Sequence, residues 1–189
     1  MNLILNIDII IWDGDCMDSI NTPQDLLKFM DDIKYEWMDK KGNFHTELVP
    51  EMFTEYSLMS PEEVLKYKKG VCTDQSEFER DWFKKHNYNF DVMSIQLFRE
   101  NDAPGHAFLW YEENGKYYWF EHAWGDEAGI HKYNSYEELI DDIKSKFIIQ
   151  NDIKEYEMSN LVIKQEKEYP YHISYEEMIE IDNKNTKKL

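Results

Sequence analysis

The stretch GHAFLWYEENGKYYWFEHAW, residues 105–124, decides the fold. Asn114-Gly115 stands between two runs rich in aromatic residues, which is the strongest short-range signal for a β-hairpin with a two-residue turn. We therefore predict two antiparallel strands, residues 106–112 and 116–124. Because residues paired across such a ladder share a face, one face is predicted to carry His106, Phe108, Trp110, Trp119, Glu121 and Ala123.

The register of this hairpin follows from counting outward from the turn. If Glu113 faces Lys116, then His106 lies opposite Ala123 and is a diagonal neighbour of Glu121. Diagonal neighbours have Cβ atoms roughly 7–8 Å apart. An imidazole and a carboxylate can span that gap with one hydrogen bond, so the register predicts a His106–Glu121 contact.

A cysteine precedes the hairpin in the chain. Cys72 follows Gly70 and Val71 and begins a predicted helix that runs to about residue 86. A helix N-terminus and a nearby histidine both lower the pKa of a thiol. The order cysteine, histidine, acid therefore predicts Cys72 as nucleophile, His106 as base and Glu121 as orienting acid. The N–H of Cys72 would be an oxyanion donor, because the first N–H groups of a helix have no internal partner.

Residues 70–124 resemble the transglutaminase-like superfamily, whose core is papain-like. The resemblance is carried by GVCTDQS at 70–76, GHAFL at 105–109 and GKYYWFEHAW at 115–124. It implies acyl transfer through a thioester on Cys72, with His106 as base and Glu121 as acid. It favours hydrolysis of an amide or peptide bond over protein cross-linking. Family members usually have aspartate, often followed by proline, where this chain has Glu121-His122.

The resemblance also leaves an alternative open, since members without activity exist. The chain would then be a non-catalytic protein-interaction module that retains the fold. Its support in the sequence is the glutamate in place of aspartate and the acids near Cys72, which oppose thiolate formation. These acids are Asp74, Glu77 and Glu79.

The expected fold class is α+β, with the helix that bears the cysteine packed on an antiparallel sheet of a papain-like, transglutaminase-like core. We expect one domain over residues 1–189, with its core at about 60–150 and elaborations at both ends. Hydrophobic spacing and capping residues predict further helices at 22–41, 60–70, 135–146 and from 174. Further strands are predicted at 3–12, 90–98, 147–150 and 160–164.

The composition and net charge limit the classes of partner that we expect. The chain has 39 acidic and 21 basic residues and a formal net charge of −18. Such a surface repels nucleic acid and anionic membranes, so we expect a peptide, protein or small amide substrate instead. Two cysteines, Cys16 and Cys72, make no disulfide framework, and no secretory signal is recognised. We therefore expect a cytoplasmic location; the substrate and the oligomeric state stay open.

Metal binding is the third and weakest interpretation. No pair among the cysteine and histidines has zinc-ligand spacing, and His122 alternates to the face opposite His106. We expect no metal and no cofactor. Three aromatic side chains near the predicted triad are candidates for a cleft wall: Trp124, Phe108 and Trp110.

Overall fold

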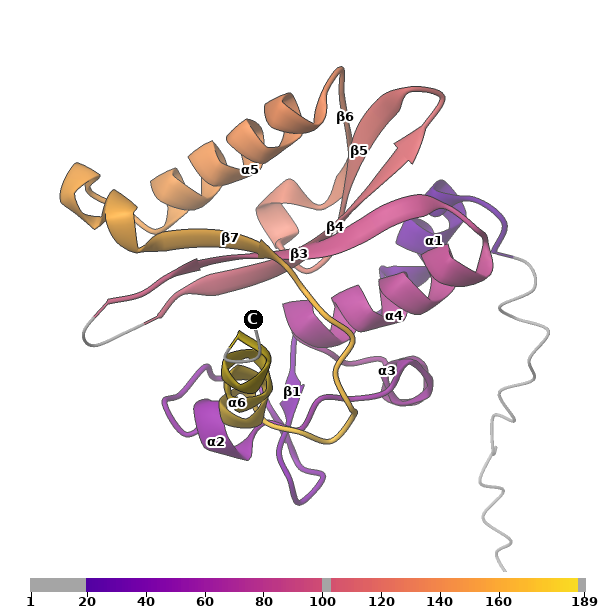
Figure 1. Cartoon of the computed structure of the whole chain (residues 1–189). Coiled ribbons are helices and arrows are strands. Elements are labelled where there is room, and N and C mark those ends of the chain that lie inside the picture. Colours follow the sequence, from indigo (N-terminus) through magenta and orange to yellow (C-terminus); the bar gives the residue numbers. More distant parts are fainter. Residues whose placement is uncertain (1–19, 100–102, 187–189) are drawn as a thin grey trace, which may run out of the picture.

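A computed structural model describes residues 20–99 and 103–186 (Figure 1). Its centre is a five-stranded antiparallel sheet in the order β6-β5-β4-β3-β7. The strands are β3 Asn89–Leu97, β4 Gly105–Glu113, β5 Lys116–Glu121, β6 Gly129–Tyr133 and β7 Leu161–Gln165. Helix α4 (Cys72–Lys85) packs on one face and helix α5 (Tyr136–Gln150) on the other. The predicted α+β class, with the cysteine helix on an antiparallel sheet, is confirmed.

Most of the remaining elements lie on the side of α4 that faces away from the sheet (Figure 1). The predicted strand at 3–12 and Cys16 lie outside the described residues. The other helices and strands are α1 Pro23–Met30, β1 Trp37–Met38, β2 Phe44–His45, α2 Met52–Glu55, α3 Pro61–Tyr67 and α6 Tyr175–Thr186, with 3-10 turns at Gly125–Glu127 and Glu155–Asn160.

Helix starts follow the capping rules. Thr22 accepts a hydrogen bond from the N–H of Asp25, and the Asp25 carboxylate accepts from the N–H of Thr22. Ser60 and Glu63 form the same reciprocal pair at the start of α3. A proline follows each cap at the first helical position, where its missing N–H costs nothing. The predicted starts at 22, 60, 135 and 174 are confirmed.

The predicted helix at 22–41 is wrong in its second half. Helix α1 ends at Met30, and Trp37–Met38 pairs with β2 across a turn in which Gly42 has a φ of +82°. The Trp37 ring stacks on His45 at 4.4 Å. The apolar spacing of this segment suits a helix, but packing between the two short strands overrides local preference.

The predicted strand at 147–150 is also wrong, because α5 continues to Gln150. Leu139, Ile143 and Phe147 are four residues apart and are all buried against the sheet. That period belongs to a helix face. A short apolar run at a helix end looks like a strand when it is taken by itself.

The central hairpin has the predicted register from Glu113–Lys116 as far as Leu109–Phe120. Asn114 and Gly115 both have positive φ, 53° and 70°, as a two-residue turn of this kind requires. However, β5 ends at Glu121 and the chain then bends away. The predicted pairing of His106 with Ala123 is therefore wrong.

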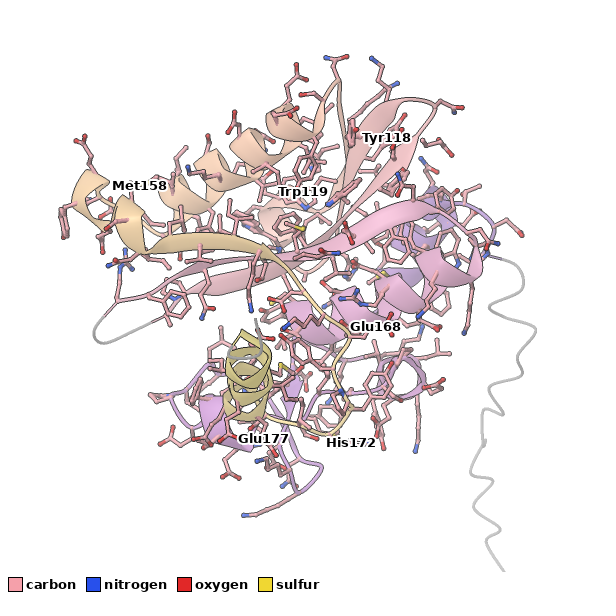
Figure 2. All side chains as sticks on the ribbon, in the orientation of Figure 1. Tyr118, Trp119, Met158, Glu168, His172 and Glu177 are labelled. Atoms are coloured by element: carbon pink, nitrogen blue, oxygen red, sulfur yellow. The ribbon has the colours of Figure 1, made fainter. Side chains whose placement is uncertain are left out.

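Three apolar clusters hold the layers together. The first joins α4 to one face of the sheet, and the second joins α5 to the other face, where Trp119 is fully buried (Figure 2). The third lies beside the N-terminus of α4 and includes Val71 and residues of α6. Within the described residues, none of the helices combines the length and apolar composition that a membrane span needs.

Candidate active site

His106 and Glu121 are in direct contact. Nε2 of His106 lies 2.7 Å from Oε2 of Glu121, although β5 ends at this glutamate. The indole N–H of Trp119 donates to the same oxygen at 3.1 Å, and the backbone N–H of Trp124 donates to the other at 2.7 Å. Glu121 is 2% exposed. Three donors therefore fix a buried carboxylate behind the imidazole, which is the geometry the hairpin predicts.

Cys72 is the first residue of α4 and is 8% exposed. His106, the N–H of Ala107 and the hydroxyl of Tyr35 act on its sulfur and lower the pKa of the thiol. Ala107 lies beyond the last residue pair of the β4–β5 ladder. The sulfur therefore lies beside β4 at a point where β5 no longer pairs with it. Since Glu121 engages Nε2 of His106, Nδ1 is the nitrogen left for the sulfur.

The electrostatics of the pair favour a thiolate and an imidazolium. Burial alone would raise the pKa of Cys72, but the hydrogen bond and charge of His106 outweigh it and hold that pKa below its ordinary value. Burial alone would lower the pKa of His106, but the charge of Glu121 and the bond to Cys72 raise it to about 10. Each group stabilises the charged form of its neighbour.

The first turn of α4 has no side-chain cap at its N-terminus. Instead, Oδ2 of Asp74 accepts from the Val71 N–H at 3.0 Å. The N–H of Cys72 sits at this uncapped end, where partial positive charge accumulates. Gly70 is required just before it, because a Cβ there would lie 2.9 Å from the Cβ of Asp74.

Two neighbours of Cys72 were not found from the sequence, whereas a third, Glu79, was predicted among the acids near it. Tyr35 and Tyr175 come from distant segments, and nothing in their local sequence indicates that they approach the cysteine. Glu79 is seven residues after Cys72 and so on the same helix face; that spacing was the available signal. Burial and the charge of Glu121 raise the pKa of Glu79 well above its ordinary value.

The candidate wall residues lie in different places. The Trp124 ring is 5.1 Å from the His106 ring and nearly perpendicular to it. Phe108 is 1% exposed, in the core between the sheet and α5. Trp110 packs on Tyr136 of α5 at 5.2 Å. Of the three, Trp124 is the one whose backbone also holds Glu121.

His122 does not join the triad. Its Nδ1 lies 2.6 Å from the side-chain oxygen of Gln75, whose amide nitrogen donates to the Gly70 carbonyl. The predicted opposite orientation of His122 and His106 is therefore reflected in their separate partners. Among residues 20–99 and 103–186, no group of three or more His, Cys, Asp or Glu side chains is arranged to hold a metal ion.

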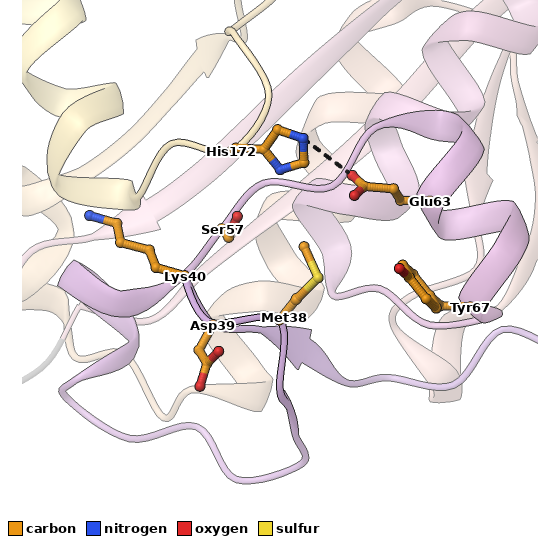
Figure 3. Close-up of a pocket in the computed structure, with 8 residues that line it drawn as sticks. Met38, Asp39, Lys40, Ser57, Glu63, Tyr67 and His172 are labelled. Carbon is orange, nitrogen blue, oxygen red and sulfur yellow. Dashed lines mark ion pairs between the residues drawn. The ribbon is translucent and has the colours of Figure 1, made fainter.

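A hollow of about 400 Å³ lies apart from these residues (Figure 3). His172 and Glu63 face each other across it at 3.7 Å. Its charged groups are already engaged: Lys40 pairs with Glu177, and Asp39 accepts hydrogen bonds from Asn43. No triad residue contributes to its lining, which is Met38, Asp39, Lys40, Gly42, Ser57, Glu63, Tyr67 and His172.

Comparison with known families gives a match. A family described as a transglutaminase-like domain matches residues 6–153, which include Cys72, His106 and Glu121. The match covers the sheet strands β3 to β6 and both helices packed on the sheet. A comparison with curated proteins gave no match.

Proposed function

Because the chain belongs to the transglutaminase-like domain family, we propose that it is a cysteine-dependent acyl-transfer enzyme that hydrolyses an amide or peptide bond through a thioester on Cys72. One observation carries this proposal. The buried Glu121 carboxylate lies 2.7 Å from the His106 imidazole, and His106 in turn lowers the pKa of the Cys72 thiol. Each member prepares the next for nucleophilic catalysis.

In the first half of the reaction, the thiolate of Cys72 attacks the substrate carbonyl carbon. The N–H of Cys72 stabilises the oxyanion. The carbon–nitrogen bond then breaks, and the imidazolium of His106 gives its proton to the leaving amine. The products of this half are a free amine and an acyl thioester on Cys72.

In the second half, neutral His106 takes a proton from water as the water oxygen attacks the thioester carbon. The carbon–sulfur bond breaks, which releases the carboxylic acid and restores the thiolate beside the imidazolium. Glu121 keeps its charge throughout, because it orients the ring and supports the imidazolium without taking its proton.

The acids near Cys72 are compensated, which supports a catalytic thiol. Both carboxylate oxygens of Asp74 accept hydrogen bonds from the backbone, at Met59 and Val71. Glu77 pairs with Arg80 at 3.1 Å. Burial also raises the pKa of Asp74 to about 7 and the pKa of Glu79 well above its ordinary value, which reduces the negative charge near the thiol.

A second candidate, a non-catalytic interaction module, is favoured by one observation. The sulfur is almost covered, and Tyr35 is one of the groups on it. On this alternative the thiol would have ordinary reactivity, and no acyl group would be transferred to it.

Alkylation by iodoacetamide separates the two candidates. We expect Cys72 to react at neutral pH much faster than Cys16, as measured by mass spectrometry of the two peptides, and His106→Ala to slow Cys72 selectively. The Cys72 rate should rise with pH through a thiol pKa below the ordinary value of about 8.5. Equal rates for the two cysteines would support the interaction module and contradict the enzyme.

A further inference from the structure

A C-terminal arm, residues 161–186, returns to the cysteine helix. It lies outside the residues that match the family, 6–153. Its first part, β7, pairs with β3 at the edge of the sheet. The next part is tied to α4: Arg80 donates to the Glu166 carbonyl at 3.1 Å, and Lys84 pairs with Glu168 at 2.8 Å (Figure 2). The arm is therefore anchored along the helix that carries the nucleophile.

The end of the arm packs in an apolar cluster beside Cys72. Helix α6 lies next to the N-terminal end of α4 (Figure 1). Met178 and the partly buried Tyr175 pack there with Tyr56 and with Val71, the residue just before Cys72. The backbone joins them too, since the Leu58 N–H donates to the Ile173 carbonyl at 3.0 Å.

Tyr175 makes a specific contact with the first turn of α4. Its hydroxyl lies 3.0 Å from the hydroxyl of Thr73, the residue directly after Cys72. Its ring stacks on Tyr56 at 4.3 Å with an interplanar angle of 9°. The Tyr56 hydroxyl in turn donates to Asp74 at 2.7 Å.

Contacts therefore reach both flanks of Cys72 from one tyrosine pair. Asp74 accepts from the Val71 N–H, so the residue before the cysteine is held by the Tyr56 branch. The residue after it, Thr73, is held by Tyr175. A helix end without a side-chain cap frays unless something else holds it, and the angle of the sulfur toward His106 depends on this turn.

We propose that the C-terminal arm is a working part of the active site and that Tyr175 is a positioning residue for Cys72, acting through its hydrogen bond to Thr73. This inference rests on the function proposed above. The matched family region supplies the triad, and the arm fixes the turn on which the nucleophile stands.

A double-mutant cycle on the full chain tests the bond. Tyr175→Phe keeps the stack on Tyr56 and removes the hydroxyl, while Thr73→Val removes the partner and keeps the shape. We expect each to slow iodoacetamide alkylation of Cys72 about 3- to 10-fold at neutral pH, the range one net hydrogen bond supplies. The double variant should alkylate no more slowly than the slower of the two single variants.

Controls separate positioning from general stability. Thr73→Ser keeps a hydroxyl and should keep most of the alkylation rate that Thr73→Val loses. Tyr156→Phe, at an exposed tyrosine, should leave that rate unchanged. Melting temperatures are measured for every variant. A purely structural contact would lower the melting temperature of Tyr175→Phe and leave the pH profile of alkylation unmoved, which would overturn the inference.

The outcomes also separate this inference from the proposed function. If Cys72 of the unmodified chain reacts no faster than Cys16, the proposed function fails, and the inference with it. If Cys72 reacts fast but Tyr175→Phe and Thr73→Val react equally fast, or if their effects simply add, the inference alone is wrong. If the two effects are not additive, Thr73→Ser rescues and the pH profile of alkylation shifts in Tyr175→Phe, the inference holds.

Discussion

Glu121 is the residue that departs from the usual family pattern, and its contacts account for the difference. The longer side chain reaches three donors at once, on His106, Trp119 and Trp124. These contacts hold the carboxylate against the His106 ring. Under the proposed function, glutamate at this position can therefore still orient the imidazole.

Glu121→Gln tests that charge with little change of shape. We expect the pKa of His106 to fall, because the charge that raises it is gone. With less imidazolium beside it, Cys72 should lose thiolate and alkylate about tenfold more slowly at neutral pH, which corresponds to one pKa unit. Glu113→Gln, at an exposed position, is the control. An unchanged rate would mean that Glu121 only packs.

The site residues could be predicted where one strand pair decides them. Alternation and a two-residue turn place His106 and Glu121 on one face, and the structure has them in contact. Tyr35 and Tyr175 could not be predicted, because their approach to Cys72 depends on packing between segments far apart in the sequence. Local patterns carry no information about such packing.

At the scale of the element, helix starts were predictable and helix ends were not. Starts are fixed by side chains such as Ser60 and Glu63 that satisfy free N–H groups. Ends leave carbonyl groups free in the same way, but backbone N–H groups and water satisfy these, so fewer side chains mark where a helix ends. Helix α3 ends with Lys68 in the left-handed region, at a φ of 52°, where glycine is the usual signal, and the sequence placed the end at Gly70.

The β4–β5 turn and the 3-10 turn after β5 each contain a glycine, and the two form a matched pair for substitution. Gly115 has a φ of +70°, and a Cβ there would meet nothing within 4 Å. Gly115→Ala should therefore cost about 1–2 kcal/mol through backbone strain alone, or roughly 2–8 °C in melting temperature for a chain of this size. Alkylation of Cys72 should be unchanged, because the register is also fixed by the alternation of buried residues.

Gly125→Ala is the control for that substitution. A Cβ at Gly125 likewise meets nothing within 4 Å, but its φ is not in the left-handed region. We expect little change in its melting temperature. Equal losses from both substitutions would show that the positive φ of the turn is not the cause.

At the scale of the whole molecule, three apolar clusters stabilise different parts of the fold. Two pack the helices α4 and α5 on opposite faces of the sheet. The third joins the C-terminal arm to the segment that leads into Cys72. The sequence predicted the sheet and the cysteine helix, but it could not predict the return of the arm, because the short helix α6 is compatible with many positions.

The acidic surface acts on the whole fold. With a formal net charge of −18, carboxylates repel one another in the folded chain more than in the extended one. Salt screens exposed charges over about 10 Å at 0.1 M ionic strength. We expect sodium chloride to raise the melting temperature by roughly 2–4 °C, the shift that about 1 kcal/mol of relieved repulsion gives at this size. Potassium chloride should act equally, since screening does not depend on which cation is added. A melting temperature that falls with salt would mean that surface ion pairs such as Lys84–Glu168 outweigh the repulsion.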